Sequence, residues 1–165
     1  MHTDAVAAIL TVIRDADITV WIDGGWGIDA LVGRETRPHK DLDLIVSAAD
    51  SSRLHAVLAE RGYRVIAGVP SGGVYENGLG ARVDISTVTF DDRGRAHRFT
   101  STGGQENCPA DAFAGTGHIN GMAVRCLSVE AQINAHRGYE PDDKDRHDVA
   151  LLCEHFGIGL PAEYR

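Results

Sequence analysis

The stretch GGWGIDALVGRETRPHKDLDL, from Gly24 to Leu44, carries the pattern that decides the fold. It follows TVWI (19–22), whose β-branched and aromatic residues are typical of a short strand. After the glycine pair, residues 26–33 fit a short helix that Gly33 ends. The stretch DLDLIV (41–46) then alternates acidic and apolar residues, which is the period of a strand. This order predicts two strands joined through a glycine turn and a helix.

The rest of the chain extends this into a mixed α and β pattern. The loop at 91–117 is long and glycine-rich, which is typical of a functional loop or of short strands without a clear period. The Asn120-Gly121 pair predicts a tight hairpin within 118–126. Together the elements predict an α+β fold, a mixed β-sheet with helices on one face, in a single domain over residues 1–165. The expected helices are 4–15, 50–61, 128–137 and 142–156, and the further strands or hairpins are 63–68, 71–80 and 81–90.

Composition narrows the class of protein. The net charge is −8 and no run of Lys or Arg is present, so we expect no nucleic-acid partner. No stretch approaches the roughly 20 apolar residues that span a bilayer, and no signal peptide is evident, so we expect no membrane partner. The three cysteines are far apart and form no Cys-x-x-Cys pair, which favours free thiols and a cytoplasmic protein.

Three aspartates are candidate metal ligands. Asp41 and Asp43 are two residues apart in a strand and therefore project from the same face. Two adjacent carboxylates repel each other, and a divalent cation such as Mg²⁺ removes that repulsion. Asp84, between two apolar residues in RVDIS, would join them if its strand were a neighbour. An exposed strand face is the alternative, because Asp-x-Asp alone is common.

A second group of residues suits an anion. Gly24-Gly25 stands between a strand and a helix, where backbone N–H groups and the helix dipole can hold phosphate. Arg37 and Lys40 follow and could offset the charge of a triphosphate. The alternatives are an ordinary tight turn for the glycines and a solvated loop for the two cations.

These residues resemble a known superfamily as an ordered set. The stretch WIDGGWGIDALVGRETRPHKDLDL (21–44) is similar to the N-terminal signature of lincosamide nucleotidyltransferases, and more loosely to that of aminoglycoside 2″-nucleotidyltransferases. The stretches GHINGMAVRCLS (117–128) and GYEPDDKDRHDVALLCEHFGI (138–158) resemble the small, single-domain lincosamide enzymes. The chain is thereby identified as a member of the superfamily that includes DNA polymerase β. Trp26 follows the glycines where most of that superfamily has Ser, so backbone amides would carry more of the phosphate contact.

The resemblance implies an activity. It implies Mg²⁺-dependent transfer of AMP from ATP or another nucleoside triphosphate to a hydroxyl of a lincosamide antibiotic. Two Mg²⁺ ions would bind Asp41, Asp43 and Asp84, with Asp84 also the general base. Lys144 would reach a phosphate. Aromatic and acidic residues suit an amine-bearing sugar derivative, and the candidates for the acceptor pocket are Tyr75, Glu76, Tyr139 and Glu140.

Alternatives stay open at this point. The acceptor could be an aminoglycoside modified at a 2″-hydroxyl, or another small molecule. A protein without enzymatic activity is also conceivable, as a regulatory module of the toxin–antitoxin type with the same fold, although retention of the three acids disfavours it. The resemblance allows a homodimer, and the residues leave the oligomeric state, the modified hydroxyl and the preferred base undecided.

Overall fold

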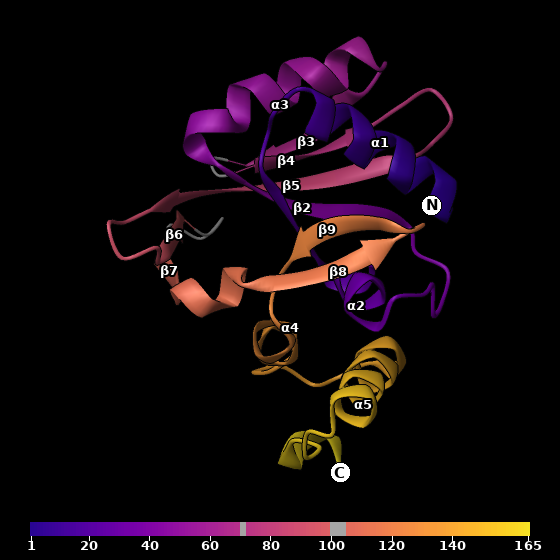
Figure 1. Ribbon diagram of the computed structural model, residues 1–165, viewed down its shortest axis with the longest axis vertical. Helices are drawn as coiled ribbons and strands as arrows, with labels where there is room; N and C mark the ends of the chain where they lie inside the picture. Colours follow the sequence, from indigo (N-terminus) through magenta and orange to yellow (C-terminus); the bar gives the residue numbers. More distant parts are fainter. Residues whose placement is uncertain (70–71, 100–104) are drawn as a thin grey trace.

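A mixed β-sheet forms the centre of the computed structural model, which describes residues 1–69, 72–99 and 105–165. Its strands lie in the order β3-β4-β5-β2-β1-β9-β8, with β6 pairing β5 and β7 (Figure 1). The β1–β9 and β2–β5 pairs are parallel and the other pairs are antiparallel. The strands are β1 (Val20–Asp23), β2 (Asp41–Ser47), β3 (Arg64–Val69), β4 (Gly72–Glu76), β5 (Arg82–Phe90), β6 (Ala96–Phe99), β7 (Gln105–Cys108), β8 (Gly115–Ile119) and β9 (Met122–Cys126).

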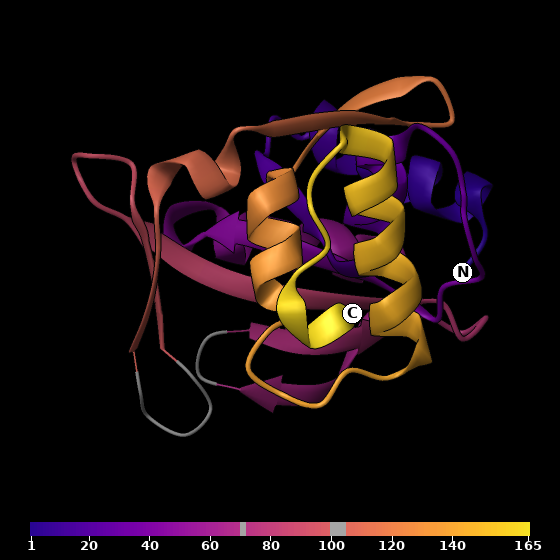
Figure 2. The same ribbon diagram turned by 90° about the horizontal axis from the view of Figure 1, so that it is seen from below.

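Helices lie on both sides of this sheet. α1 and α3 cover one side, and α4 and α5 lie on the other, where they run next to each other (Figures 1 and 2). The predicted α+β class and mixed sheet are confirmed, but the helices are not confined to one face. The α-helices are α1 (Thr3–Asp15), α2 (Gly24–Val32), α3 (Ala48–Glu60), α4 (Val129–Ala135) and α5 (Asp143–Phe156), and short 3₁₀ helices are η1 (Ala110–Phe113) and η2 (Ala162–Tyr164).

The side chains of β2 alternate between the two faces of the sheet and contribute to a separate apolar cluster on each face. Leu42 and Leu44 join the main core under α1 and α3, where Leu54 of α3 is fully buried. Ile45 points to the other face and packs with Val88 into a smaller apolar cluster that Ala131 of α4 adjoins. Because successive side chains of a strand alternate between faces, the acids of β2 share the face of Ile45. The acids therefore lie on the side of the sheet that faces α4 and α5.

Local signals set most helix ends. Gly33 ends α2 in the left-handed conformation, with φ 78°, as the sequence predicts. Asp142 caps α5 through a reciprocal capping box with Asp145. The start of α3 differs from the prediction, because the Ser47 hydroxyl accepts a hydrogen bond from the Asp50 amide and begins the helix earlier.

The hairpin regions are partly as predicted. Asn120 and Gly121 both have positive φ values, 50° and 76°, and join β8 to β9, which confirms the tight turn. The 91–117 region contains β6, β7 and η1, which the sequence did not place. Ser71 of the 71–80 region and residues 100–104 of this loop lie outside the described residues. Among the residues that the structure describes, no helix is long and apolar enough to cross a membrane.

Candidate active site

Four aspartates gather on one face of the sheet. Asp43 of β2 is in register with Asp84 of the parallel strand β5, which confirms that these strands are neighbours. Asp23, the last residue of β1, is in register with Asp43 on the other side. Asp41 lies two residues before Asp43 on the same face. We call these four residues the acid row. Asp23 was part of the sequence pattern but was not predicted as a site residue.

Burial and mutual repulsion shape the electrostatics of the acid row. Burial raises the pKa of Asp43 to about 7, and the charges of Asp41, Asp23 and Asp84 add to the shift. Burial also raises the pKa of Asp84, with a further contribution from Asp41 and an opposing one from Arg98. The pKa of Asp23 is raised by burial, against the effect of a hydrogen bond from the Gly24 amide. The acid row therefore favours the binding of a cation or a positively charged group.

The raised pKa of Asp43 predicts how stability depends on pH. Its carboxyl titrates near 3.8 when unfolded and near 7 when folded, so the folded state binds more protons between these values. Stability of the metal-free protein should therefore fall as pH rises through this window, and then level off. Asp43→Asn cannot titrate, and we expect it to lose less stability than the wild type between pH 5 and pH 8. Urea unfolding in EDTA at both pH values measures this, and equal losses would contradict it.

The Gly24-Gly25 turn allows the backbone at the start of α2 to pack closely against the acid row. Gly24 begins α2 with φ 59°, and a Cβ there would lie 2.4 Å from Oδ2 of Asp43. A Cβ at Gly25 would lie 2.2 Å from Nδ1 of His39 and 2.9 Å from Nη2 of Arg37. A side chain at either position would collide with a polar group of the site. The two glycines thus let the N-terminus of α2 lie directly beside a carboxylate and a guanidinium.

Ion pairs and hydrogen bonds fix Arg37 beside this turn. Its Nε and Nη2 donate to the two carboxylate oxygens of Asp148 on α5, at 2.9 and 2.6 Å. Nη1 lies 3.1 Å from Nδ1 of His39, whose Nε2 lies 2.5 Å from the buried carboxylate of Asp29. The hydrogen bonds that Arg37 donates to Asp148 raise the pKa of Arg37, so the guanidinium stays charged. Asp148 is 111 residues from Arg37 and has no local signal that could have linked the two.

The other predicted phosphate ligands stand apart from this network. Lys40 and Lys144 are both exposed, on the approach to β2 and in the first turn of α5. Trp26 is 1 % exposed and its ring packs against His39, with a centroid distance of 4.7 Å. This position belongs to the core, so Trp26 serves as packing.

The predicted acceptor residues do not gather at one place. Tyr75 is 6 % exposed and packs against His55 in the main core, on the face opposite the acids, because it is in register with Val83. That prediction is wrong for Tyr75. Glu76 forms an ion pair with Arg82 at 2.5 Å on the acid face. Tyr139 and Glu140 are exposed in the segment before α5.

A cavity of about 660 Å³ adjoins the acid row instead. Asp23 is the member of the row that lines it, and Arg98 reaches into it from β6. Arg98 donates to Ser86 at 3.2 Å and pairs with Glu106 at 2.5 Å. Sequence reasoning missed Arg98, because the short polar strand that carries it shows no clear period.

The donor set of the row fits a divalent cation. Carboxylate oxygens are the ligands that Mg²⁺ prefers, and a cation would offset the repulsion that raises the pKa of Asp43. Within residues 1–69, 72–99 and 105–165, no three His, Cys, Asp or Glu side chains already form a metal-binding group. The carboxylates would therefore have to turn toward an ion on binding.

Parallel strands with paired acids, a glycine turn at a helix N-terminus and a charged arginine beside it are the features of a nucleotidyltransferase. A family model described as aminoglycoside-2''-adenylyltransferase matches residues 5–152. The chain belongs to this family and is an enzyme of the nucleotidyltransferase class. Membership implies a nucleoside triphosphate as co-substrate and a divalent metal ion.

Individual relatives point to two kinds of antibiotic. A lincosamide resistance protein of Staphylococcus haemolyticus is 29 % identical over 145 residues, covering 87 % of this chain and 89 % of the relative. A 2''-aminoglycoside nucleotidyltransferase of Escherichia coli is 35 % identical over 136 residues, covering 81 % and 73 %. The crystal structure of the lincosamide antibiotic adenylyltransferase LnuA with bound lincomycin superposes with a TM-score of 0.79 at 28 % identity, covering 89 % of this chain and 93 % of that one. The nucleotidyltransferase fold is thereby established.

Proposed function

We propose that the chain transfers AMP from ATP to a hydroxyl group of a lincosamide antibiotic and so inactivates it. The observation that carries the chemistry is the register of Asp43 with Asp84 on neighbouring parallel strands, beside the Gly24-Gly25 turn. Two Mg²⁺ ions held by Asp41, Asp43 and Asp84 would supply charge neutralisation for the attacking and leaving oxygens. This arrangement supports an in-line displacement at the α-phosphorus.

Different residues of the chain serve the attack of the acceptor and the departure of pyrophosphate. The acceptor oxygen attacks the α-phosphorus while the carboxylate of Asp84 accepts its proton, a role that its raised pKa favours. The bond from the α-phosphorus to the bridging oxygen breaks, and pyrophosphate leaves. The backbone of Gly24 and Gly25 and the guanidinium of Arg37 hold its negative charge. Lys40 and Lys144, both exposed, could add to this charge when the triphosphate is bound.

Coverage supports a lincosamide as acceptor. In sequence, the match covers 89 % of the lincosamide resistance protein and 73 % of the aminoglycoside enzyme. The structural matches differ less, and cover 93 % of LnuA and 89 % of the aminoglycoside enzyme ANT(2")-Ia. The cavity beside the acid row is lined in part by the apolar residues Ile45, Val88 and Leu127, which suits a molecule with an apolar part. An aminoglycoside is the second candidate, because the family model and the 35 % identity favour it. The homodimer stays a prediction that light scattering can test.

An adduct assay tests the acceptor. The protein is incubated with MgATP and either lincomycin or kanamycin, and the products are analysed by mass spectrometry. We expect lincomycin to gain the mass of AMP and kanamycin to stay unmodified. An adduct on kanamycin alone would overturn the lincosamide assignment and leave nucleotidyl transfer intact. No adduct on either antibiotic would indicate another acceptor.

A further inference from the structure

His39 is a buried histidine beside the Gly24-Gly25 turn, and the proposed reaction gives it no role. Its ring packs against the ring of Trp26. A Cβ at Gly25 would lie 2.2 Å from Nδ1 and 2.4 Å from Cε1 of His39, so the ring occupies the space that a side chain there would take. Packing therefore restricts the ring before any of its hydrogen bonds are considered.

The two ring nitrogens of His39 have partners of opposite kinds. Nε2 lies 2.5 Å from the carboxylate of Asp29, which accepts hydrogen bonds. Nδ1 lies 3.1 Å from Nη1 of Arg37, and a guanidinium can only donate. A neutral imidazole with its proton on Nε2 satisfies both partners. His39 thus donates to Asp29 and accepts from Arg37.

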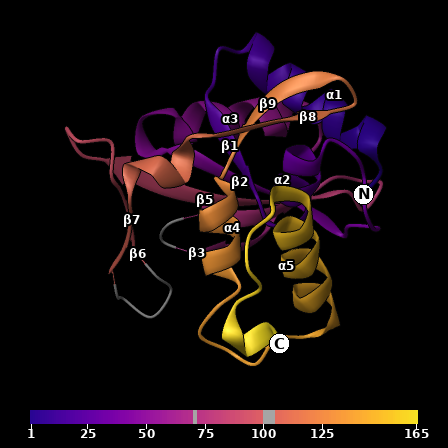
Figure 3. The ribbon, with the colours of Figure 1, turned by 60° about the horizontal axis from the view of Figure 1, so that its bottom comes forward.

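Asp29 fastens this arrangement to α2. Its side chain is 2 % exposed, and Oδ1 accepts hydrogen bonds from the amide, at 3.1 Å, and from the hydroxyl of Thr36. Oδ2 is the partner of His39. The segment that carries Arg37 is therefore tied to the helix on both sides of Arg37. α5 lies next to α2 and supplies Asp148 to the same guanidinium (Figure 3).

These contacts leave one of the five N–H groups of Arg37 for a ligand. Nε and Nη2 each donate to Asp148, and Nη1 lies 3.1 Å from Nδ1 of His39 and 3.4 Å from the carbonyl oxygen of Pro38. The second N–H of Nη2 has no acceptor among the residues that the structure describes. Nη2 would lie 2.9 Å from a Cβ at Gly25, at the start of α2. An anion there can take this N–H together with backbone amides.

We propose that His39, oriented by Asp29, is a positioning residue that directs the guanidinium of Arg37 toward the phosphate groups of the nucleotide. The two bonds to Asp148 hold one edge of the guanidinium but allow it to tilt about the axis between the two groups. The third contact, from Nη1 to His39, removes that freedom. The proposal rests on the proposed function, in which Arg37 holds the charge of the leaving pyrophosphate.

Two substitutions separate the two contacts of His39. The amide of Asn lies where Nδ1 lies, and the longer Gln reaches the position of Nε2. His39→Asn therefore keeps an acceptor for Arg37 and loses the donor for Asp29, whereas His39→Gln keeps the donor and loses the acceptor. We expect His39→Asn to be the less stable variant, because the buried carboxylate of Asp29 loses a partner. We expect His39→Gln to be the weaker nucleotide binder.

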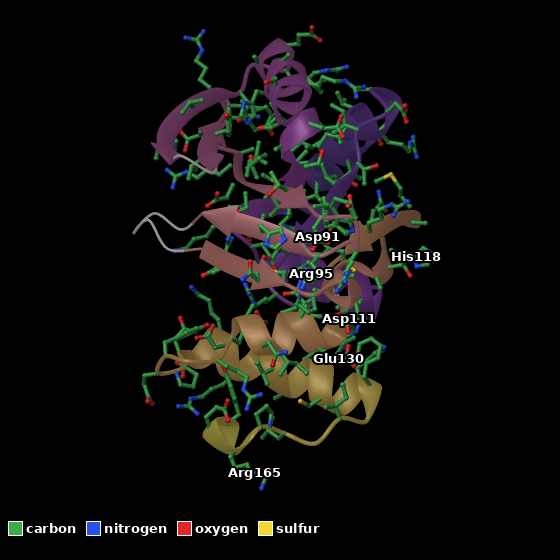
Figure 4. All side chains as sticks on the ribbon, turned by 90° about the vertical axis from the view of Figure 1, so that its left-hand side faces the viewer. Asp91, Arg95, Asp111, His118, Glu130 and Arg165 are labelled. Carbon is green, nitrogen blue, oxygen red and sulfur yellow. The ribbon has the colours of Figure 1, made fainter. Side chains whose placement is uncertain are left out.

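Calorimetric titration with α,β-methylene-ATP and Mg²⁺ measures nucleotide affinity without turnover, because this analogue cannot release pyrophosphate. We expect its Kd to rise by about tenfold or more in His39→Gln and by about threefold or less in His39→Asn. His118→Gln makes the same substitution at an exposed histidine of β8, which projects from the outer edge of the molecule in Figure 4, and should bind as the wild type does. Urea unfolding of each variant gives the order of stability.

A double-variant cycle tests whether His39 acts through Arg37. Arg37→Met should itself weaken binding of the analogue, because the guanidinium is gone. Adding His39→Gln to Arg37→Met should then raise the Kd little further, since no group is left to position. A further rise of about tenfold would show that His39 contacts the nucleotide directly, and would overturn the positioning role.

The outcomes distinguish this role from the proposed function. If His39→Asn binds the analogue more weakly than His39→Gln, or if neither changes the Kd, His39 serves the fold alone and the proposal is overturned, even where the adduct assay succeeds. Absence of wild-type binding would also overturn it. If His39→Asn does not fold, the double-variant cycle decides. The expected order of affinities without any AMP adduct would support the positioning role and contradict the proposed transfer.

Discussion

Asp84→Asn should lower turnover by about 10²-fold or more while leaving the fold intact. The amide cannot accept the proton of the acceptor hydroxyl, and it is a weaker ligand for a divalent cation. Stability should change little or increase, because Asp84 adds to the repulsion that raises the pKa of Asp43. Turnover at saturating Mg²⁺, followed through pyrophosphate release, gives the first quantity and urea unfolding gives the second.

A matched control separates this effect from a general loss of charge. Asp92→Asn changes an exposed aspartate in the turn between β5 and β6, remote from the acid row, and should keep wild-type turnover. If Asp84→Asn keeps near-normal turnover, Asp84 is not the general base. A variant that loses both stability and turnover would instead indicate a structural role.

Asp148→Leu should destabilise the protein by about 2 to 3 kcal/mol and also reduce turnover. The side chain of Asp148 is 3 % exposed and that of Arg37 is 23 % exposed, so the variant leaves a partly buried guanidinium without its carboxylate. The freed Arg37 can then leave the Gly25 backbone, and the leaving pyrophosphate loses its fixed cation. Urea unfolding and steady-state kinetics with MgATP measure the two effects.

The double variant Arg37→Met/Asp148→Leu distinguishes stability from function. Replacing both members of a buried ion pair by apolar residues restores much of the stability lost by removing one. We therefore expect the double variant to unfold near the wild type while its turnover stays low. Recovery of turnover together with stability would show that Arg37 acts only in folding.

The sequence predicted those site features that depend on strand period and on local turns. The alternation around Asp41, Asp43 and Asp84 set their common face, and Gly24-Gly25 marked the start of a helix. Such signals are local, because a strand or turn fixes the direction of its side chains within a few residues.

The rest of the site depends on contacts that no local pattern contains. Tyr75 was predicted as an acceptor residue, but its register with Val83 turns its ring to the face opposite the acids, and the sequence of its own strand does not contain that register. Asp148 meets Arg37 only through the packing of α5. The polar segments that form β6 and β7 lack the alternation of a half-buried strand, so the cavity wall could not be predicted.

The parallel pairing of β2 with β5 also bears on the order in which the protein folds. Asp43 and Asp84 lie side by side only after β2 has paired with β5. This pairing closes a loop of about forty residues that includes α3, β3 and β4. Such non-local pairing forms slowly compared with the neighbouring antiparallel contacts of β3, β4 and β5. A partly folded chain can therefore contain the hairpins and helices without the catalytic carboxylates being assembled. On refolding, we expect enzymatic activity to return with the last kinetic phase rather than with the recovery of secondary structure.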